Sequence, residues 1–214
     1  MRMKNSTFSI LIAAVASLTG CAAVAPAPDY EMLVSEMMKA SFRDQGIAKV
    51  DRLQQDMSNV ECSKSEGKAL PEATARAIEA VNLKTVKLPS DGKFIGDWKE
   101  GEKLAQNGRG MTWTDTSTAN GGNCYNCHQV SKAEISYGTI GPSLYNYGKL
   151  RGVADPASPA SKAIVEYTWG KLYNAKAYNA CSGMPRFGHG GMLDETQLKN
   201  IMALLLDPKS PVNQ

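Results

Sequence analysis

The sequence predicts an all-α protein, and three observations support this class. Apolar residues recur three and four positions apart in several segments, which is the spacing of one helix face. Residues typical of helix N-termini precede two of these segments. No segment shows the strict alternation of apolar and polar residues that indicates a half-buried strand, and the chain contains no internal repeat.

The N-terminus carries the features of an export signal. Arg2 and Lys4 precede an apolar run over residues 8–16. This run is far shorter than the roughly 20 apolar residues that cross a bilayer, so we predict a signal peptide over residues 1–20 and not an anchor helix. We therefore expect the protein in the periplasm.

Two cleavage sites fit this signal, and the sequence leaves both open. Leu18-Thr19-Gly20-Cys21 resembles a lipobox, in which cleavage leaves Cys21 at the new N-terminus to carry lipid. Alternatively, the signal is cut after Ala14-Val15-Ala16. We favour the lipobox, which predicts a lipoprotein tethered to the membrane through Cys21.

Residues 21–29 form a predicted linker rich in proline and alanine, and residues 30–90 form a predicted helical extension. Apolar periodicity predicts two helices within residues 30–62, interrupted at Gly46. A third helix is predicted over about residues 71–82, opened by a proline at its first position. An extended stretch and a turn follow it.

Residues 91–210 form the predicted main domain, and caps mark its first and last helices. Asp97 caps a predicted helix that ends at about Gln106, before an Asn-Gly pair. Another helix is predicted over about residues 159–173. The last helix begins at Asp194, where a glutamine three residues later completes a capping box. Its apolar stripe consists of Leu198, Ile201, Met202 and Leu205.

The segment Cys124-Tyr125-Asn126-Cys127-His128 is a C-x-x-C-H motif, which is typical of covalent haem attachment. Each of the two thiols can add to one vinyl group of haem, and the histidine is then placed under the iron as its proximal ligand. We predict one haem c bound through Cys124 and Cys127, with His128 on the iron. The export signal agrees, because haem is attached in this way only outside the cytoplasm.

Two other uses of a C-x-x-C pair fit this chain less well. A zinc site lacks ligands, since the chain has two histidines and Cys127 beside His128 cannot easily reach one tetrahedral ion together with it. A thioredoxin-like dithiol needs a strand–turn–helix setting, and the chain has no α/β pattern.

Met184 is the predicted second axial ligand of the iron. It lies in a loop before the last helix, and Pro185 stiffens the backbone directly after it. His189 and Met192 remain alternatives, because imidazole and thioether are both common axial donors. Ligation by histidine and methionine fills both axial positions and raises the reduction potential, which predicts electron transfer and not substrate chemistry at this iron.

We expect the Gly141-Pro142 segment to support the proximal histidine. A carbonyl in this loop could accept the other ring N–H of His128, which would strengthen His128 as a ligand. The alternative is an ordinary turn.

The two cysteines not yet assigned, Cys62 and Cys181, are expected to form a disulfide, which an exported protein permits. Such a bond would close a loop of over a hundred residues and stabilise the fold by about 4–5 kcal/mol on the chain-entropy treatment. The alternative is that Cys181, three positions before Met184, is a reactive thiol.

Charge excludes nucleic acid as a partner. Loss of Arg2 and Lys4 with the signal leaves 22 basic against 21 acidic side chains, and no basic run follows. Outside the signal, no apolar run is long enough to span a membrane.

These motifs resemble those of class I cytochromes c, and longer strings resemble the SoxX family, the monohaem subunits of thiosulfate-oxidising SoxXA complexes. The resemblance covers most of the mature chain. Its strings are residues 40–43, Asp91–Trp98, Asn123–Gln129, Tyr137–Leu144, Met184–His189 and Leu204–Pro208.

The resemblance implies a class I cytochrome c fold with a helical N-terminal extension. It also implies that the chain is the electron-accepting subunit of an L-cysteine S-thiosulfotransferase complex, which joins thiosulfate to a cysteine of a SoxYZ-like carrier. The catalytic haem would belong to a SoxA-like partner with one or two haems, and a small soluble cytochrome c would accept the electrons.

Two other functions remain open from the sequence. The first is a free-standing periplasmic cytochrome c that passes electrons to a terminal oxidase. The second is an enzyme in which Cys181 is catalytic.

Overall fold

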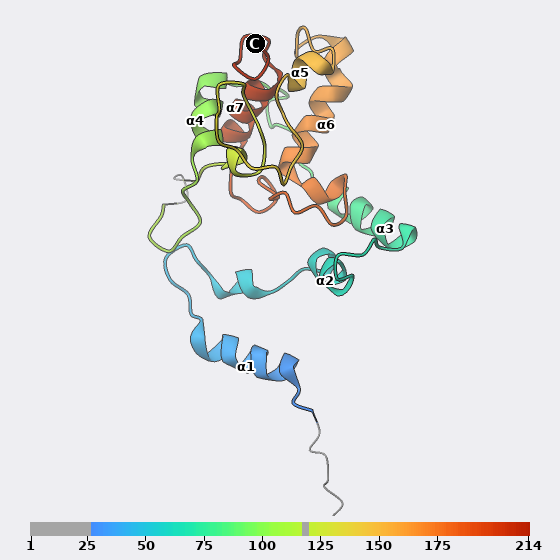
Figure 1. Ribbon diagram of the computed structural model, residues 1–214, viewed down its shortest axis with the longest axis vertical. Coiled ribbons are helices and arrows are strands. Elements are labelled where there is room, and N and C mark those ends of the chain that lie inside the picture. Colours follow the sequence, from blue (N-terminus) through green and yellow to red (C-terminus); the bar gives the residue numbers. More distant parts are fainter. Residues whose placement is uncertain (1–26, 117–119) are drawn as a thin grey trace, which may run out of the picture. The chain divides into compact units, whose positions relative to one another are not determined.

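The computed structural model describes residues 27–116 and 120–214 (Figure 1). The predicted signal peptide, both of its cleavage sites and Cys21 lie outside these residues. Within them the chain forms helices and loops, and its only β-type pairing is an isolated bridge between Gln45 and Ala48. The α-helices are α1 (Tyr30–Ser41), α2 (Met57–Lys64), α3 (Glu72–Leu83), α4 (Trp98–Gln106), α5 (Tyr147–Leu150), α6 (Lys162–Tyr173) and α7 (Glu195–Leu206). The 3-10 helices are η1 (Val50–Leu53), η2 (Cys124–Asn126), η3 (Pro159–Ser161) and η4 (Ala175–Ala177).

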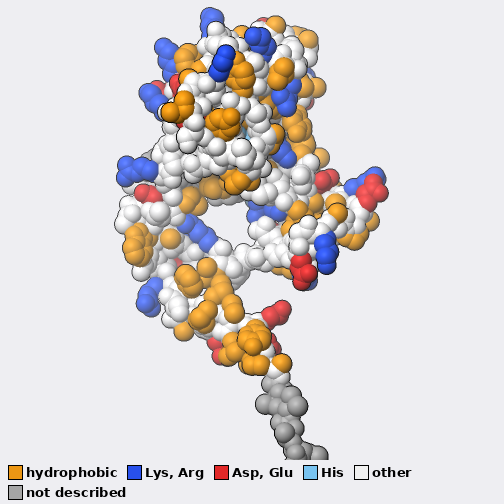
Figure 2. Space-filling model, in the orientation of Figure 1, with side chains coloured by type: hydrophobic (Ala, Val, Ile, Leu, Met, Phe, Trp, Pro, Cys, Tyr) orange, Lys and Arg blue, Asp and Glu red, His pale blue; other side chains and the backbone are white. Residues whose placement is uncertain are grey.

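The described chain divides into two units, residues 27–41 and residues 42–214. The first unit holds α1, which begins where the Asp29 carboxylate accepts the Met32 amide at 3.0 Å. Taken by itself, α1 carries apolar side chains over much of its surface, as Figure 2 shows. Residues 42–90, placed with α1 in the predicted extension, belong to the same compact unit as residues 91–214.

The structure corrects one predicted helix in the extension. The predicted break at Gly46 is present, with φ of +49°, but the chain beyond it forms η1 and then α2 instead of one helix. Asp56 is the reason, because its backbone is extended and its carboxylate accepts the Asn59 amide at 2.9 Å, which starts a new helix. The third predicted helix is confirmed as α3, directly after Pro71.

α4 and α7 pack against each other and form the centre of the second unit. Both predicted caps are confirmed: Asp97 accepts the Lys99 amide at 2.8 Å, and Asp194 forms a capping box with Gln197. Gly101 of α4 faces the main chain of α7 so closely that a Cβ would overlap the carbonyl of Asn200. The predicted apolar stripe of α7 is fully buried.

α6 completes the core and confirms the predicted helix before Tyr173. Trp169 on this helix is 1% exposed, and its indole N–H donates to the Lys87 carbonyl at 2.8 Å. Phe94 packs edge-on against the same ring, with 5.6 Å between the ring centroids. Trp169 thus attaches the extended stretch after α3 to the core. The short helices α5, η2 and η4 were not predicted, because three or four residues carry no apolar periodicity.

Candidate functional site

The C-x-x-C-H motif folds into a single tight turn that begins at η2. Asn123, just before it, adopts left-handed backbone angles (φ 50°, ψ 37°). The amides of Cys127 and His128 both donate to the Cys124 carbonyl, at 3.1 and 2.9 Å. Both thiols and the imidazole therefore lie on one turn of the chain.

The end of α4 positions this turn. The Gly122 amide donates to the Leu104 carbonyl at 2.8 Å, and the Asn123 amide donates to the Asn107 carbonyl at 3.1 Å. A Cβ on Gly122 would lie 3.1 Å from the Cys124 sulfur, so this glycine leaves space beside the thiol. Since α4 packs on α7, the turn is attached to the most buried part of the molecule.

The following loop runs back along the other side of the turn. The Gly138 amide donates to the Tyr125 carbonyl at 2.8 Å, and the Gly141 amide donates to the Cys127 carbonyl at 2.8 Å. The Leu144 amide donates to the Gln129 carbonyl at 2.7 Å. These three bonds fix the loop beside the motif.

The loop supplies the predicted partner of the histidine ring. His128 Nδ1 lies 2.6 Å from the Pro142 carbonyl oxygen, which confirms the expected contact. A carbonyl can only accept, so Nδ1 carries a hydrogen, and in the neutral ring Nε2 keeps a lone pair that can bind a metal. Gly141 lies flat against the ring, where a Cβ would overlap the imidazole. The sequence predicted that the Gly141-Pro142 segment supports His128, and the structure shows that Gly141 itself lies on the ring.

Cys124 and Cys127 are both free thiols and partly buried. Burial raises the pKa of the Cys124 thiol to about 12, so the free thiol stays protonated at neutral pH. Among the described residues, no group of three or more His, Cys, Asp or Glu side chains is arranged to hold a metal ion.

Met184 is half-buried at the edge of the hydrophobic core, a position it shares with Cys124 and Met192. Its amide donates to the Ser182 hydroxyl at 3.3 Å. His189 is exposed; partial desolvation and the nearby Arg186 guanidinium lower the pKa of its ring. Burial therefore favours the two methionines over His189 as the ligand from this loop.

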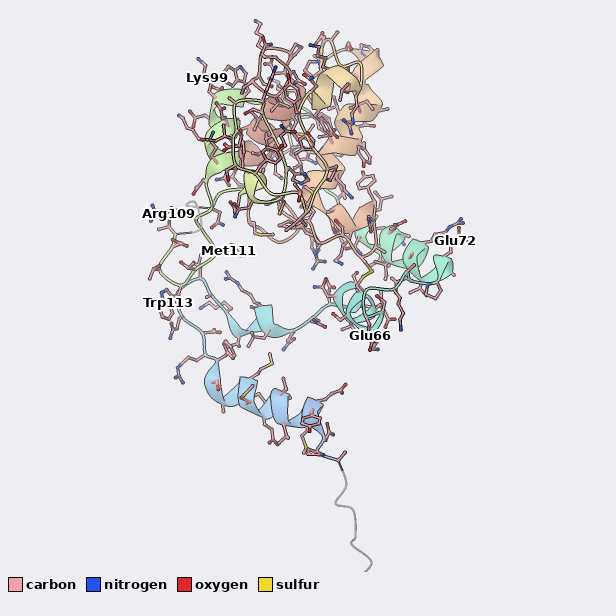
Figure 3. The ribbon with its side chains drawn as sticks, viewed as in Figure 1. Glu66, Glu72, Lys99, Arg109, Met111 and Trp113 are labelled. Atoms are coloured by element: carbon pink, nitrogen blue, oxygen red, sulfur yellow. A yellow bond between two sulfur atoms is a disulfide. The ribbon has the colours of Figure 1, made fainter. Side chains whose placement is uncertain are left out.

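The predicted disulfide is confirmed. Cys62 and Cys181 are bonded, with 5.5 Å between their Cα atoms and a sequence separation of 119 residues. Figure 3 draws this bond in yellow beside α2. Cys181 is thus not the free thiol that a reactive or catalytic role requires.

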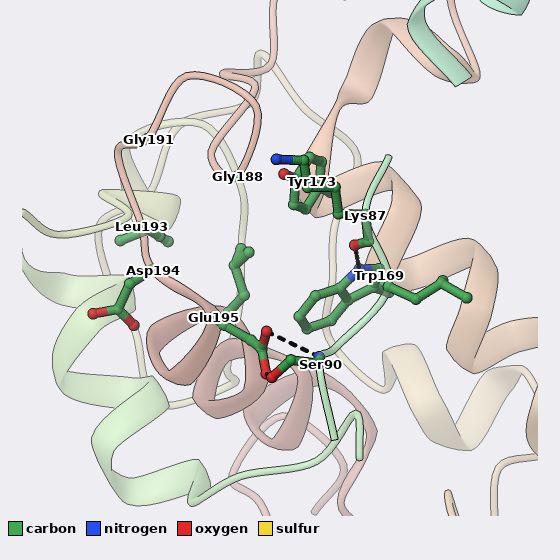
Figure 4. Close-up of a pocket in the computed structure, with 11 residues that line it drawn as sticks. Lys87, Ser90, Trp169, Tyr173, Gly188, Gly191, Leu193, Asp194 and Glu195 are labelled. Carbon is green, nitrogen blue, oxygen red and sulfur yellow. Dashed lines mark hydrogen bonds between the residues drawn. The ribbon is translucent and has the colours of Figure 1, made fainter. Parts of the chain in front are cut away.

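A cavity of about 560 Å³ lies between α6, the N-terminus of α7 and the stretch after α3 (Figure 4). Trp169, Tyr173 and Leu193 are among the residues that line it, and none of the four predicted site residues is. The Glu195 carboxylate accepts the amide and hydroxyl of Ser90 at 3.0 and 2.9 Å. Because these polar groups already satisfy each other, we assign the cavity no ligand.

Part of the chain is similar to a known protein. No protein-family model matches the chain. An uncharacterized lipoprotein from Aquifex aeolicus (strain VF5) is 37% identical over 132 residues. The match covers 61% of this chain and 59% of that protein, so the similarity extends over less than two thirds of either. In the part of the chain that the structure describes, no helix combines the length and apolarity needed to cross a membrane.

Proposed function

We propose that this protein is an exported monohaem cytochrome c that transfers electrons. The single observation that carries the proposal is the turn at residues 124–128, where two free thiols accompany an imidazole whose Nδ1 is bonded to the Pro142 carbonyl. An imidazole held in this way offers Nε2 to a metal, and the two thiols account for covalent attachment.

The residues present fit a haem c. Cys124 and Cys127 would hold it covalently, and His128 and Met184 would bind its iron. When bound, haem c supplies an iron that gains and loses one electron. The chain's own contribution is to orient His128 through Pro142 and Gly141, and to offer a thioether at the edge of an apolar core that excludes water.

The packing of α4 on α7, with the thiol turn hydrogen-bonded to the end of α4 through Gly122 and Asn123, supports a class I cytochrome c fold. The finer proposal is that the chain acts as a SoxX-like subunit, which accepts electrons from a SoxA-like partner while thiosulfate is joined to a SoxYZ-like carrier. The strings shared with that family support it. A small soluble cytochrome c would then take the electrons onward.

We also propose that Cys21 carries lipid and tethers the protein to the membrane in the periplasm. The lipobox at residues 18–21 supports this, and so does the name of the similar protein from Aquifex aeolicus, a lipoprotein.

Intact-protein mass spectrometry and visible spectroscopy of the purified mature protein test the proposal together. We expect a covalent haem adduct, a lipid on Cys21 and a low-spin spectrum that shifts on reduction. The Cys124→Ala/Cys127→Ala variant should lose the adduct, whereas the Cys62→Ser/Cys181→Ser control should keep it. A colourless protein, or one heavier by zinc, would refute the proposal.

The SoxX-like assignment needs a separate experiment. Affinity purification from the native host should recover a second, larger haem protein, and deletion of the gene should lower thiosulfate oxidation. Recovery of the chain alone, with unaltered thiosulfate turnover, would instead favour a free-standing carrier to a terminal oxidase.

A further inference from the structure

We propose that α2 serves as a brace that positions Met184, through the Cys62–Cys181 disulfide on one side and the Asp56–Arg186 ion pair on the other. The proposal rests on the proposed function, in which Met184 binds the haem iron. It assigns a positioning role to a segment that lies outside the motif and its loop.

The first attachment precedes Met184 in the chain. Cys181 lies three residues before Met184 and is covalently bonded to Cys62, near the C-terminal end of α2. Residue 180, just before it, is held by both of its backbone groups: the Ala180 amide donates to Glu79 of α3 at 3.2 Å, and its carbonyl accepts from Lys176 at 3.0 Å. The chain therefore enters the Met184 loop from a fixed point.

The second attachment follows Met184. Arg186 lies two residues after it, and its guanidinium donates to the Asp56 carboxylate. The Arg186 side chain is 20% exposed, so water screens this pair less than a pair on the open surface. Asp56 is also the residue that caps α2. The chain therefore leaves the Met184 position through a second fixed point on the same helix.

The two attachments make an arch across α2. Asp56 and Cys62 are six residues apart, which corresponds to roughly 9 Å along a helix axis. The chain from Cys181 to Arg186 could reach about 17 Å if fully extended, which is long enough to span the two attachments. Met184 lies between them. The helix therefore limits how far the two ends of the loop can move apart.

A buried polar network fixes the brace itself. The Asn82 side chain of α3 donates to the Ser58 hydroxyl of α2 at 2.9 Å. Asn174, at the end of α6, donates to Asn82 at 3.0 Å and to the Thr85 hydroxyl at 2.9 Å. Ser58, Asn82 and Asn174 are all buried, at 5%, 4% and 0% exposure. A network of satisfied buried groups holds its elements in one arrangement, so α2 and α3 cannot shift easily against α6.

This arrangement matters because the proposed bond between the Met184 thioether and the iron has to hold a flexible side chain in place. Fixing both ends of the loop removes conformational freedom before the thioether binds, which lowers the entropic cost of ligation. Release of either attachment should leave Met184 detached for a larger fraction of the time. The sixth position would then admit an external ligand more readily.

The experiment measures how readily carbon monoxide binds to the reduced holoprotein, together with the reduction potential. Asp56→Asn removes the charge but keeps a good helix cap, and we expect carbon monoxide to bind about threefold faster. Cys62→Ser/Cys181→Ser should increase the rate about tenfold or more. Both variants should have a lower reduction potential, since the methionine is bound for less time.

Matched controls separate positioning from a general loss of stability. Glu72→Gln removes an exposed ion pair with Arg76 on α3 and should leave the carbon monoxide rate unchanged. Arg186→Lys keeps the charge and should stay closer to the wild type than Arg186→Gln. If the double cysteine variant does not fold, the Asp56 and Arg186 variants still decide the question.

The outcomes distinguish this inference from the proposed function. If all haem-loaded variants bound carbon monoxide as slowly as the wild type, with unchanged potentials, the positioning role of α2 would be refuted and the proposed function would stand. A wild type without haem, or a Met184→Ala variant with the wild-type potential, would overturn the proposed ligation and the brace with it.

Discussion

The two sides of the candidate site are held by different kinds of contact. On the His128 side, backbone hydrogen bonds and the bond from the His128 ring to the Pro142 carbonyl join residues that are at most 18 positions apart, between Leu104 and Leu144. On the Met184 side, the contacts are a disulfide and an ion pair whose partners are 119 and 130 positions apart. The first side forms as one local unit, whereas the second forms only when the extension and the main domain have come together.

This difference predicts that substitutions on the His128 side prevent stable haem binding. Substitutions on the Met184 side should leave the haem attached and weaken only the binding of the methionine to the iron. The largest effect is expected for His128→Ala, because nothing else on the turn can replace the imidazole. The variant should lack stable low-spin haem in visible absorption spectra. His189→Ala is the control and should keep the wild-type spectrum; an intact spectrum in His128→Ala would contradict the assignment.

Met184→Ala should be the next most severe change, but it should leave the haem attached. Loss of the thioether opens the sixth position, lowers the reduction potential and allows carbon monoxide to bind. Potentiometry with carbon monoxide titration checks this, with Met192→Ala as the matched control. If Met192→Ala, and not Met184→Ala, lowered the potential, the ligand assignment would move to Met192.

Removal of the disulfide should lower global stability as well as loosen the loop. Cys62→Ser/Cys181→Ser is expected to reduce the free energy of unfolding by about 4–5 kcal/mol, because the bond closes a very long loop in the unfolded chain. Thermal or urea unfolding of the holoprotein measures this. Equal stability of variant and wild type would show that the unfolded chain is not restricted by the bond.

Gly141→Ala tests the local side with a smaller change. Its Cβ would overlap the His128 ring, so the loop must shift, at a cost of about 1–3 kcal/mol. Gly183→Ala is the matched control, because a Cβ there meets no atom within 4 Å. We expect a lower melting temperature and a shifted potential in Gly141→Ala only. A Gly141→Ala variant with the wild-type melting temperature and potential would mean that His128 tolerates a displaced loop.

The smallest expected effect is on the pH dependence of stability that the Asp56–Arg186 ion pair contributes. Burial alone would raise the pKa of Asp56, but the hydrogen bond from Asn59 and the Arg186 guanidinium outweigh it and lower this pKa below its usual value. The resulting stability is present above the unfolded pKa, about 3.9, and is lost as the pH falls through the lower folded value. It should amount to about 0.5 kcal/mol, because the Asp56 side chain is 41% exposed and water partly screens the pair. Unfolding between pH 6 and 2 should show this loss in the wild type and not in Asp56→Asn.

Particular elements show what the sequence could predict. The predicted caps Asp97 and Asp194 placed the beginnings of α4 and α7 correctly, because a cap acts within three residues of its own position. The Cys62–Cys181 pair followed from the export signal and from the assignment of the other cysteines. The same local rules failed at residues 47–62, where apolar periodicity suggested one helix and the cap at Asp56 divided it.

By itself, the sequence determined the turn that carries two thiols and a histidine, together with the caps of the core helices, because these features depend on neighbours a few residues apart. The sequence also predicted that the Gly141-Pro142 segment supports His128 and that Cys62 pairs with Cys181. Only the tertiary structure decided that Asp56 pairs with Arg186, so that α2 holds both ends of the Met184 loop. This ion pair joins residues 130 positions apart. The sequence carries no local sign of it, since the pair forms only once the core has assembled.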